Sequence, residues 1–350
     1  MIDNSSPELE ALRRAGVEAY RRHAVVEGRR AFEQVLQQRP TDAVSLFHLS
    51  LILQSQGEAE PALKLLKAAA SADQLYATTK GVGFYLAMRR HVREGSPFED
   101  GWLSFLELAL LSGILPQNTL AGLAALPANA PGIGIPRRIL QYWDKAVPPD
   151  EVSLLMQRCR AANPDYEHAL FSDDAAQDFL ATEYGTRIVD IYRGCFHVAA
   201  KADFFRLAYL YRHGGFYVDA DEVCDRSLDP FLQTGGIEEI YTFSRGLPSC
   251  INNWFIGTVS GTRIVERAFN YCIQNIDSTM RHGRKSGVWV LTGPGALSFA
   301  ILDLFCEPEQ YFGGNPFQKT VFLEESEYRR IFTAPPMEYK ASKEGNWRLI

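Results

Sequence analysis

The sequence lacks the features that mark several large classes of protein. Its six cysteines are scattered, with no C-x-x-C pair and no metal-site spacing, so we expect reduced core thiols rather than a disulfide framework. The longest apolar run, residues 103–115, is interrupted by Glu107 and is too short to span a bilayer. No basic-then-apolar signal stands at the N-terminus. The net charge of −6 gives no reason to expect a nucleic-acid partner.

What remains is the composition of an ordinary globular protein, 46% hydrophobic and 22% charged. A length of 350 residues predicts one or two domains. We expect no transmembrane segment.

Residues 1–125 show helical periodicity and no convincing strand. Small or apolar residues recur there at the 34-residue spacing of tetratricopeptide repeats, first at Gly16, Gly28, Phe32 and Pro40 and then at Ser50, Ala62, Leu66 and Gln74. We predict an all-α tetratricopeptide-like domain, whose concave face could bind a peptide. A plain antiparallel helical domain with chance register is the alternative.

A linker is predicted over 126–134, because this stretch holds two prolines and two glycines and has little apolar bulk. In the remaining region, 135–350, strand patterns alternate with helix patterns. Such alternation predicts an α/β sheet with helices on both faces and ligands at the carboxyl ends of its strands. We expect strands at 137–143, 166–171, 216–220, 239–244 and 253–259, and helices at 149–162, 174–183, 186–193, 197–213, 262–276 and 295–305.

The most informative segment is 201–222, K-A-D-F-F-R-L-A-Y-L-Y-R-H-G-G-F-Y-V-D-A-D-E. It predicts a nearly all-apolar helix, a Gly-Gly break and a short strand that runs into Asp219-x-Asp221. A helix that is apolar all round is buried, so Asp203 and Arg206 on this helix are charges within apolar surroundings. Buried charges are costly unless they are paired or bind a ligand. The segment therefore indicates a site for a metal ion and a phosphorylated ligand.

Tyr217, Asp219 and Asp221 share one face of the predicted strand because the side-chain period of a strand is two. Residues two apart lie roughly 6–7 Å from one another. One cation at ~2.1 Å from both carboxylates would need the strand to turn there, or one contact through water. Hard cations such as Mn2+ or Mg2+ take oxygen ligands and share them with substrate phosphates.

The segment resembles the sugar-binding region, with its D-x-D motif, of glycosyltransferase family 32. The matching string is Ala202-Asp203-Phe204-Phe205-Arg206, then Gly214-Gly215-Phe216-Tyr217-Val218 and Asp219-Ala220-Asp221. Upstream, 135–143 resembles the opening strand of that family, and downstream Asn252-Asn253 and Thr292-Gly293-Pro294 resemble its later signatures. The sequence departs from the family at Leu140 and near Ala341, where histidine is frequent. Because of the second departure, the resemblance is weaker around Asn346 and Trp347 at the C-terminal end.

The resemblance implies a GT-A fold and a metal-dependent, retaining glycosyltransferase that uses a nucleotide-sugar donor, with a UDP-sugar favoured. It implies that Asp219 and Asp221 hold Mn2+ or Mg2+, that Asp203 binds sugar hydroxyls and that Arg206 contacts the sugar or the diphosphate. Trp143 would stack on the base. The expected donor-binding residues are Ile139, Gln141, Trp143, Tyr217, Asn253, Asn346 and Trp347. The acceptor would be a glycan, as in polysaccharide biosynthesis, or a protein.

Two other functions stay open. One is a non-catalytic tetratricopeptide adaptor that carries a silent transferase domain. The other is an aspartyl-phosphate phosphatase, since residues 219–223 fit its D-x-D-x-[T/V] motif, but that motif should end the first strand and needs a later acidic G-D-x-x-x-D, which the sequence lacks. Without the membrane anchor of Golgi relatives, we expect a bacterial cytoplasmic protein, with a secreted effector as the alternative.

Overall fold

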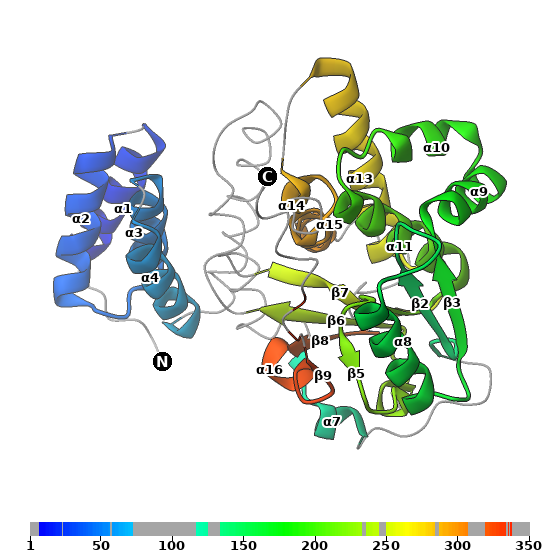
Figure 1. Ribbon diagram of the computed structural model, residues 1–350. Coiled ribbons are helices and arrows are strands. Elements are labelled where there is room, and N and C mark those ends of the chain that lie inside the picture. The colour runs from blue at the N-terminus through cyan, green and yellow to red at the C-terminus, as the bar shows by residue number, and fades with distance from the viewer. Residues whose placement is uncertain are drawn as a thin grey trace. The chain divides into compact units, whose positions relative to one another are not determined.

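The computed structural model describes residues 7–22, 24–56, 58–72, 117–124, 134–232, 236–244, 250–283, 287–306, 319–333, 335 and 337 (Figure 1). These residues fall into two compact units, one of helices only and one built around a sheet. Each unit is described by itself.

The described residues of the helical unit form two consecutive helical hairpins, made by α1 (Pro7–Arg21), α2 (Val25–Gln38), α3 (Ala43–Ser55) and α4 (Ala59–Ala72). Gly16 allows α1 and α2 to approach closely, since a Cβ there would lie 2.8 Å from the Phe32 ring. Phe32, Ile52 and Ala62 are buried in its core. The tetratricopeptide-like organisation of these hairpins stays a prediction.

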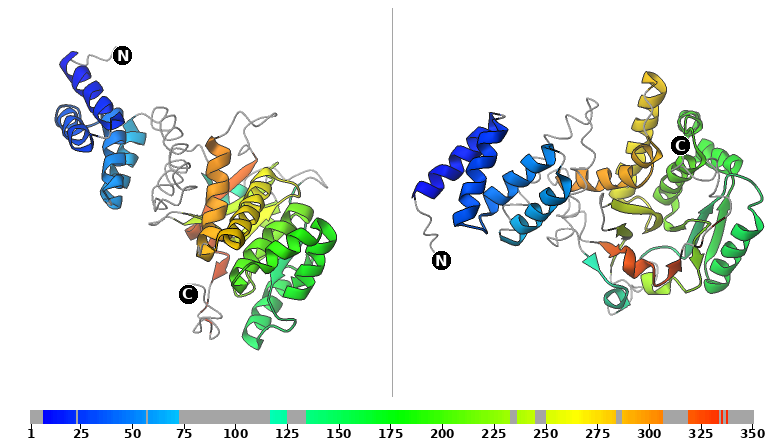
Figure 2. Two further views of the ribbon diagram at one scale, coloured as in Figure 1. Left: turned by 90° about the horizontal axis from the view of Figure 1, so that it is seen from above. Right: turned by 60° about the vertical axis from the view of Figure 1, so that its left-hand side comes forward.

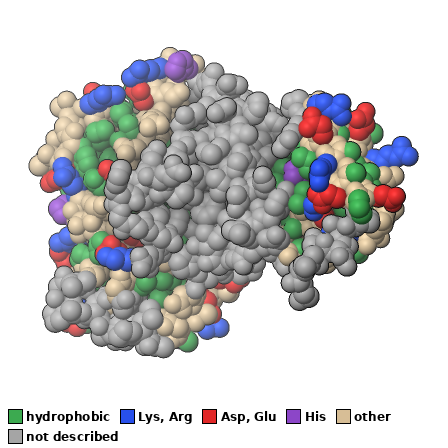
Figure 3. Space-filling view, turned by 180° about the vertical axis from the view of Figure 1, so that it is seen from behind, with side chains coloured by type: hydrophobic (Ala, Val, Ile, Leu, Met, Phe, Trp, Pro, Cys, Tyr) green, Lys and Arg blue, Asp and Glu red, His purple; other side chains and the backbone are tan. Residues whose placement is uncertain are grey.

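Opposite charges are interspersed on the face of the helical unit that Figure 3 displays. Arg29 pairs with Glu33 at 2.9 Å and with Glu58 at 3.2 Å. Such exposed pairs stabilise a fold by at most about 1 kcal/mol, so they contribute little to the stability of the helical unit.

The second unit is built on a seven-stranded mixed sheet with the strand order β1-β8-β6-β7-β4-β2-β3. Strand β7 runs antiparallel to both of its neighbours, and the other neighbours pair in parallel. The strands are β1 (Gln117–Asn118), β2 (Arg138–Tyr142), β3 (Glu167–Phe171), β4 (Gly215–Val218), β6 (Glu239–Ser244), β7 (Cys250–Thr258) and β8 (Thr320–Glu324). A small second sheet pairs β5 (Val223–Cys224) with β9 (Phe332–Thr333).

Helices cover both faces of the sheet, as the alternation of patterns predicted (Figure 2). On one face, Ile139 and Phe216 share a core with Cys159 and Phe231 from the covering helices. On the other face, Tyr142 contacts Phe205. The helices are α7 (Leu120–Ala124), α8 (Asp150–Ala162), α9 (Asp173–Tyr184), α10 (Thr186–Arg193), α11 (Val198–His213), α12 (Asp229–Leu232), α13 (Arg263–His282), α14 (Val288–Leu291), α15 (Pro294–Cys306) and α16 (Glu325–Tyr328).

The Gly214-Gly215 pair sets the step from α11 to β4. Both glycines have positive φ, +64° and +109°, which residues with a Cβ rarely adopt. A Cβ on Gly214 would also lie 2.8 Å from backbone atoms of Ser260 and Thr258, and one on Gly215 would lie 2.8 Å from the Arg138 carbonyl oxygen. Glycine is required here because the chain enters the sheet against the neighbouring backbone.

The sheet unit begins earlier than predicted. Residues 1–125 were expected to be helical, but β1 pairs in parallel with β8, and Leu123 is buried in the core of the sheet unit. A two-residue strand carries no period of its own, so its pattern could not reveal it. The predicted linker, 126–134, lies outside the described residues except for its last position.

Candidate active site

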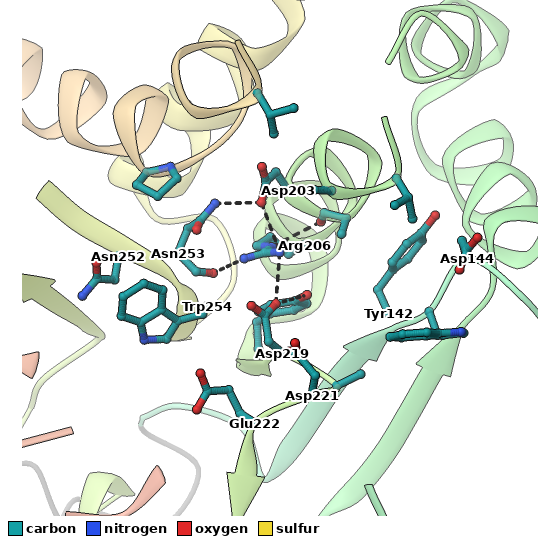
Figure 4. Close-up of a pocket in the computed structure, with 18 of the residues that line it drawn as sticks. Tyr142, Asp144, Asp203, Arg206, Asp219, Asp221, Glu222, Asn252, Asn253 and Trp254 are labelled. Carbon is teal, nitrogen blue, oxygen red and sulfur yellow. Dashed lines mark hydrogen bonds and ion pairs between the residues drawn. The ribbon is translucent and has the colours of Figure 1, made fainter. Parts of the chain in front are cut away.

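A cavity of about 1030 Å³ opens where β2 and β4 end, the edge at which ligand binding was expected (Figure 4). Side chains that follow these two strands line it together with residues from α11 and β7. It brings together seven of the predicted site residues: Trp143, Asp203, Arg206, Tyr217, Asp219, Asp221 and Asn253.

Arg206 lies at the centre of the polar network and is only 4% exposed. Its Nη2 lies 3.1 Å from Asp203 Oδ1 and 3.2 Å from Asp219 Oδ1. Its Nη1 donates to the Asn253 carbonyl oxygen, and its guanidinium stacks 4.0 Å from the centre of the Tyr217 ring. The guanidinium therefore binds its own protein on every side, which indicates a positioning role.

Asp203 is buried, and both of its carboxylate oxygens accept hydrogen bonds. Oδ1 accepts from Asn253 Nδ2 at 2.8 Å, and Oδ2 accepts from Thr292 Oγ1 at 3.1 Å. Burial raises the pKa of this carboxyl, while the Arg206 charge and the bonds from Thr292 and Asn253 oppose the rise. The network thus holds Asp203 in one orientation at the cavity wall.

The chain turns at the D-x-D motif, as one cation shared by both carboxylates would require. Strand β4 ends at Val218, and the Glu222 N–H donates to the Asp219 carbonyl oxygen at 3.1 Å. Asp219 Oδ1 also accepts from the Tyr217 hydroxyl at 2.8 Å. Burial raises the pKa of Asp219 to about 6, although the Arg206 charge opposes the rise.

The residues at this turn fit a divalent cation that is shared with a ligand. Asp219 and Asp221 offer carboxylate oxygens, the ligands that Mn2+ and Mg2+ prefer. Across the described residues, no group of three or more His, Cys, Asp and Glu side chains converges on one metal position. Two carboxylates with phosphate oxygens and water completing the shell are typical of Mg2+ in phosphate-ligand sites.

A bulge in β7 forms one wall of the cavity. Tyr241 pairs with Ile256, but the next residue, Thr242, pairs with Asn252, so 253–255 are extra residues on β7. Bulges re-aim side chains and occur next to active sites. Here the bulge brings Asn253 to Asp203, and the Trp254 carbonyl oxygen accepts from the Asp219 N–H at 3.0 Å.

The opposite wall follows β2 and consists of Tyr142, Trp143 and Asp144 (Figure 4). The Tyr142 hydroxyl lies 3.0 Å from the Tyr192 hydroxyl and donates to Asp173 Oδ1 at 3.2 Å. Asp173 is in turn held by Lys201 at 2.9 Å. This support fixes the end of β2, from which the Trp143 side chain extends.

Two of the predicted donor-binding residues, Ile139 and Gln141, are described but do not line the cavity. Ile139 is fully buried inside β2, where it pairs with His168 on one side and Phe216 on the other. Gln141 is also buried, and no group pairs with its Nε2. The side chains of Ile139 and Gln141 therefore do not line the cavity, and donor contact through the backbone after Ile139 stays a prediction. Asn346 and Trp347 lie outside the described residues.

Sequence reasoning missed several polar residues of the cavity. Glu222 is 6% exposed and forms an ion pair with Arg329 at 2.8 Å, and burial raises its pKa to about 7. Trp254, Ser244 and Glu325 also line the cavity. The only sequence signal among these residues was the charge of Glu222 directly after the D-x-D motif. The other three residues lie on strands and helices whose proximity in space cannot be predicted from a local sequence pattern.

Comparison with known proteins gives this constellation a context. Residues 149–237 match the family model of the glycosyltransferase sugar-binding region containing the DXD motif. The matched DXD region contains Asp203, Arg206, Asp219 and Asp221.

Part of this chain is also similar to curated proteins. Inositol phosphoceramide mannosyltransferase 3 of Schizosaccharomyces pombe is 32% identical over 36% of this chain and 34% of its own length. An uncharacterized glycosyltransferase, L373, of Acanthamoeba polyphaga mimivirus is 29% identical over 45% of this chain and 61% of its own. The chain therefore spans about a third of the first relative and three fifths of the second.

Among solved structures, the PaToxG glycosyltransferase aligns with 48% of this chain and 69% of its own, at 17% identity and a TM-score of 0.38.

None of the described helices is both long and apolar enough to cross a membrane.

Proposed function

We propose that this chain is a metal-dependent glycosyltransferase with a GT-A fold that takes a sugar from a nucleotide-sugar donor. The observation that carries the proposal is the Asp203–Arg206–Asp219 network, which is buried beside the D-x-D turn within the matched DXD region. An isolated D-x-D is common, but here two carboxylates share one buried guanidinium at the mouth of a large cavity. A purely structural network would not need Asp221 beside that cavity.

The transfer breaks the bond between the anomeric carbon and the diphosphate, and the bonding electrons leave with the diphosphate. The acceptor hydroxyl oxygen forms the new bond to the anomeric carbon, and its proton passes to an oxygen of the leaving diphosphate. A divalent cation on Asp219 and Asp221 would stabilise the negative charge that develops on the leaving diphosphate. Following the family resemblance, the configuration at the anomeric carbon is retained.

The chain's own residues would hold the donor in place. Trp143 offers a flat apolar face for the base, and the network around Arg206 keeps Asp203 ready for sugar hydroxyls. Arg206 itself would orient Asp203 and Asp219 rather than bind the diphosphate, because its donors are already engaged. Preorganised polar groups of this kind need little rearrangement during the reaction.

The test is release of nucleoside diphosphate from a panel of UDP- and GDP-sugars in the presence of Mn2+. We expect one donor to be hydrolysed slowly and the Asp219→Ala/Asp221→Ala double variant to lose at least about 100-fold of that rate. The Asp190→Ala variant, an exposed carboxylate on α10, is the control and keeps the rate. Turnover of phosphate esters alone would favour a phosphatase. Absence of donor binding would favour a silent transferase domain.

A further inference from the structure

A second set of polar side chains lines the cavity on the β7 side, and it differs from the Arg206 network. We call it the β7 wall: Glu222, Ser244, Asn252, Trp254, Glu325 and Arg329. Figure 4 shows Asn252 and Trp254 across the Asp219 and Asp221 carboxylates from Tyr142 and Asp144. A donor whose base lies against Trp143 and whose diphosphate lies at the D-x-D turn would therefore leave this wall uncovered.

Asn252 is 1% exposed, and its Nδ2 lacks a hydrogen-bond partner. Its Oδ1 lies 3.0 Å from Ser244 Oγ, which also lies 2.5 Å from Glu325 Oε2. Ser244 has a single hydroxyl proton for these two neighbours. Whichever way the amide is turned, one polar atom of Asn252 is left unpaired, and a hydroxyl group, which both donates and accepts, satisfies either orientation.

Trp254 presents a second unpaired group on the same wall. Its Nε1–H is buried without a hydrogen-bond partner and can only donate. The Arg329 guanidinium lies 5.2 Å from the centre of the indole ring. An unpaired buried donor is unfavourable, and both Asn252 and Trp254 line the cavity, so a ligand with hydroxyl groups in this part of the cavity would pair with them.

The charges of the β7 wall indicate what that ligand is. Arg329 binds Glu222 at 2.8 Å and Glu325 at 3.3 Å, so two carboxylates face one guanidinium that is already engaged. Arg329 therefore offers no unpaired positive charge to an added phosphate or sulfate. Ligand hydroxyls, by contrast, can donate to these carboxylates and accept from Trp254 and Asn252.

We propose that the β7 wall is the acceptor subsite and that it binds a neutral polyhydroxylated ring, a sugar or cyclitol residue with no phosphate next to the accepting hydroxyl. The proposal rests on the glycosyltransferase function proposed above and names the class of its acceptor. The cavity, at about 1030 Å³, exceeds the volume of a typical single-ligand pocket and has room for such a ring beside a donor.

Two variants test the subsite by removing the unpaired groups: Asn252→Leu and Trp254→Phe. Thr242→Val is the matched control, because Thr242 is buried with an unpaired Oγ1 on the neighbouring strand but does not line the cavity. Asn252→Leu also removes the bond from Ser244, and Trp254→Phe removes part of the contact with Tyr328, so the melting temperature of each variant is measured beside its binding.

Binding is measured by ligand-observed NMR on the full chain with Mg2+ and UDP. The neutral probes are methyl α-mannopyranoside and myo-inositol; their counterparts are mannose 6-phosphate, inositol 1-phosphate and a Ser/Thr-rich peptide. We expect a neutral ring to bind, with affinity about fivefold or more lower in Asn252→Leu and Trp254→Phe and unchanged in Thr242→Val. Tighter binding of a phosphorylated probe or the peptide, or equal binding by all variants, would overturn the proposal.

A second measurement separates this proposal from the broader function. Transfer to the preferred probe should fall in Asn252→Leu and Trp254→Phe while donor hydrolysis in water stays within about twofold of wild type. If hydrolysis falls as far as transfer, the β7 wall belongs to the donor site and the acceptor proposal is wrong. If wild type hydrolyses no donor, the glycosyltransferase function is wrong, whatever the NMR binding result.

Discussion

The two sides of the cavity differ in whether their buried polar groups are paired. Around Arg206, the buried charges pair with one another: Asp203 and Asp219 share the guanidinium, and Asn253 and Thr292 hold Asp203. On the β7 wall, Asn252 and Trp254 each keep an unpaired polar atom. The first side is complete without a ligand and holds its geometry; the second is incomplete and has donors available for a ligand.

This difference separates stability from binding. Removing a member of the Arg206 network leaves a buried charge uncompensated, so the fold should suffer along with activity. Replacing the residues with unpaired atoms on the β7 wall uncovers no buried charge, so binding should suffer more than the fold. Each prediction below probes one side of this contrast.

The largest expected effect is on stability. Arg206→Ala should lower the free energy of unfolding by about 3–5 kcal/mol, because it leaves the buried Asp203 and the partly buried Asp219 without a counter-charge. Arg212→Ala on the same helix is the control: its partner is Glu183, and both side chains are substantially exposed, so the loss should stay below about 1 kcal/mol. Denaturant unfolding measures both. Similar losses in the two variants would show that the Arg206 network is not structurally special.

Trp143→Ala should weaken nucleotide binding by about 1–3 kcal/mol, the range measured when a base loses an aromatic stacking partner. Trp143→Phe should retain much of the affinity. Titration calorimetry with UDP and GDP checks both. An unchanged affinity in Trp143→Ala would place the base elsewhere in the cavity.

Metal-dependent nucleotide binding should weaken as the pH falls below about 6. The pKa of Asp219 is raised to about 6, so protons compete with the cation for this carboxylate, and affinity should fall up to about tenfold per pH unit below that value. The folding stability of the metal-free protein changes with pH in the opposite direction to the binding affinity. A raised carboxyl pKa stabilises the folded state at low pH, and this stabilisation is lost as the pH rises from 3.8 through about 6. Titrations at pH 5, 6 and 7.5 test the first claim, and pH-independent binding would contradict it.

The smallest effect concerns the Tyr217 hydroxyl, which donates to Asp219 at 2.8 Å. Tyr217→Phe should cost about 1 kcal/mol of unfolding free energy. The hydrogen bond from Tyr217 lowers the pKa of Asp219. Its removal should therefore raise this pKa and move the pH midpoint of metal-dependent binding upward. A downward shift would mean that the hydroxyl does not stabilise the Asp219 carboxylate.

The sequence made α11 and β4 predictable for a local reason. An unbroken apolar helix with Asp203 and Arg206, followed by two glycines, specifies burial, paired charges and a sharp entry into the sheet. The alternation downstream likewise predicted β6, β7 and the helices α13 and α15. These features depend on residues that are close to one another in the sequence.

What the sequence could not predict depends on distant contacts. The bulge in β7 arises from its register with β6, and Arg329 reaches Glu222 from 107 positions away. Strand β8 was not predicted, although it pairs with β6 through five residue pairs. The expectation that Ile139 and Gln141 bind the donor came from family position, whereas the sheet pairs Ile139 on both sides and the cavity begins only at Tyr142.

The most direct test of the contrast between the two walls is calorimetric titration of UDP or GDP with and without Mn2+. Wild type, Asn252→Leu and Trp254→Phe should bind the nucleotide only with the metal and with similar affinity, and Asp219→Asn/Asp221→Asn should lose that binding. Metal-independent binding in wild type, or an equal loss in the β7-wall variants and the carboxylate variant, would contradict the assignment of the donor and the acceptor to opposite sides of the cavity.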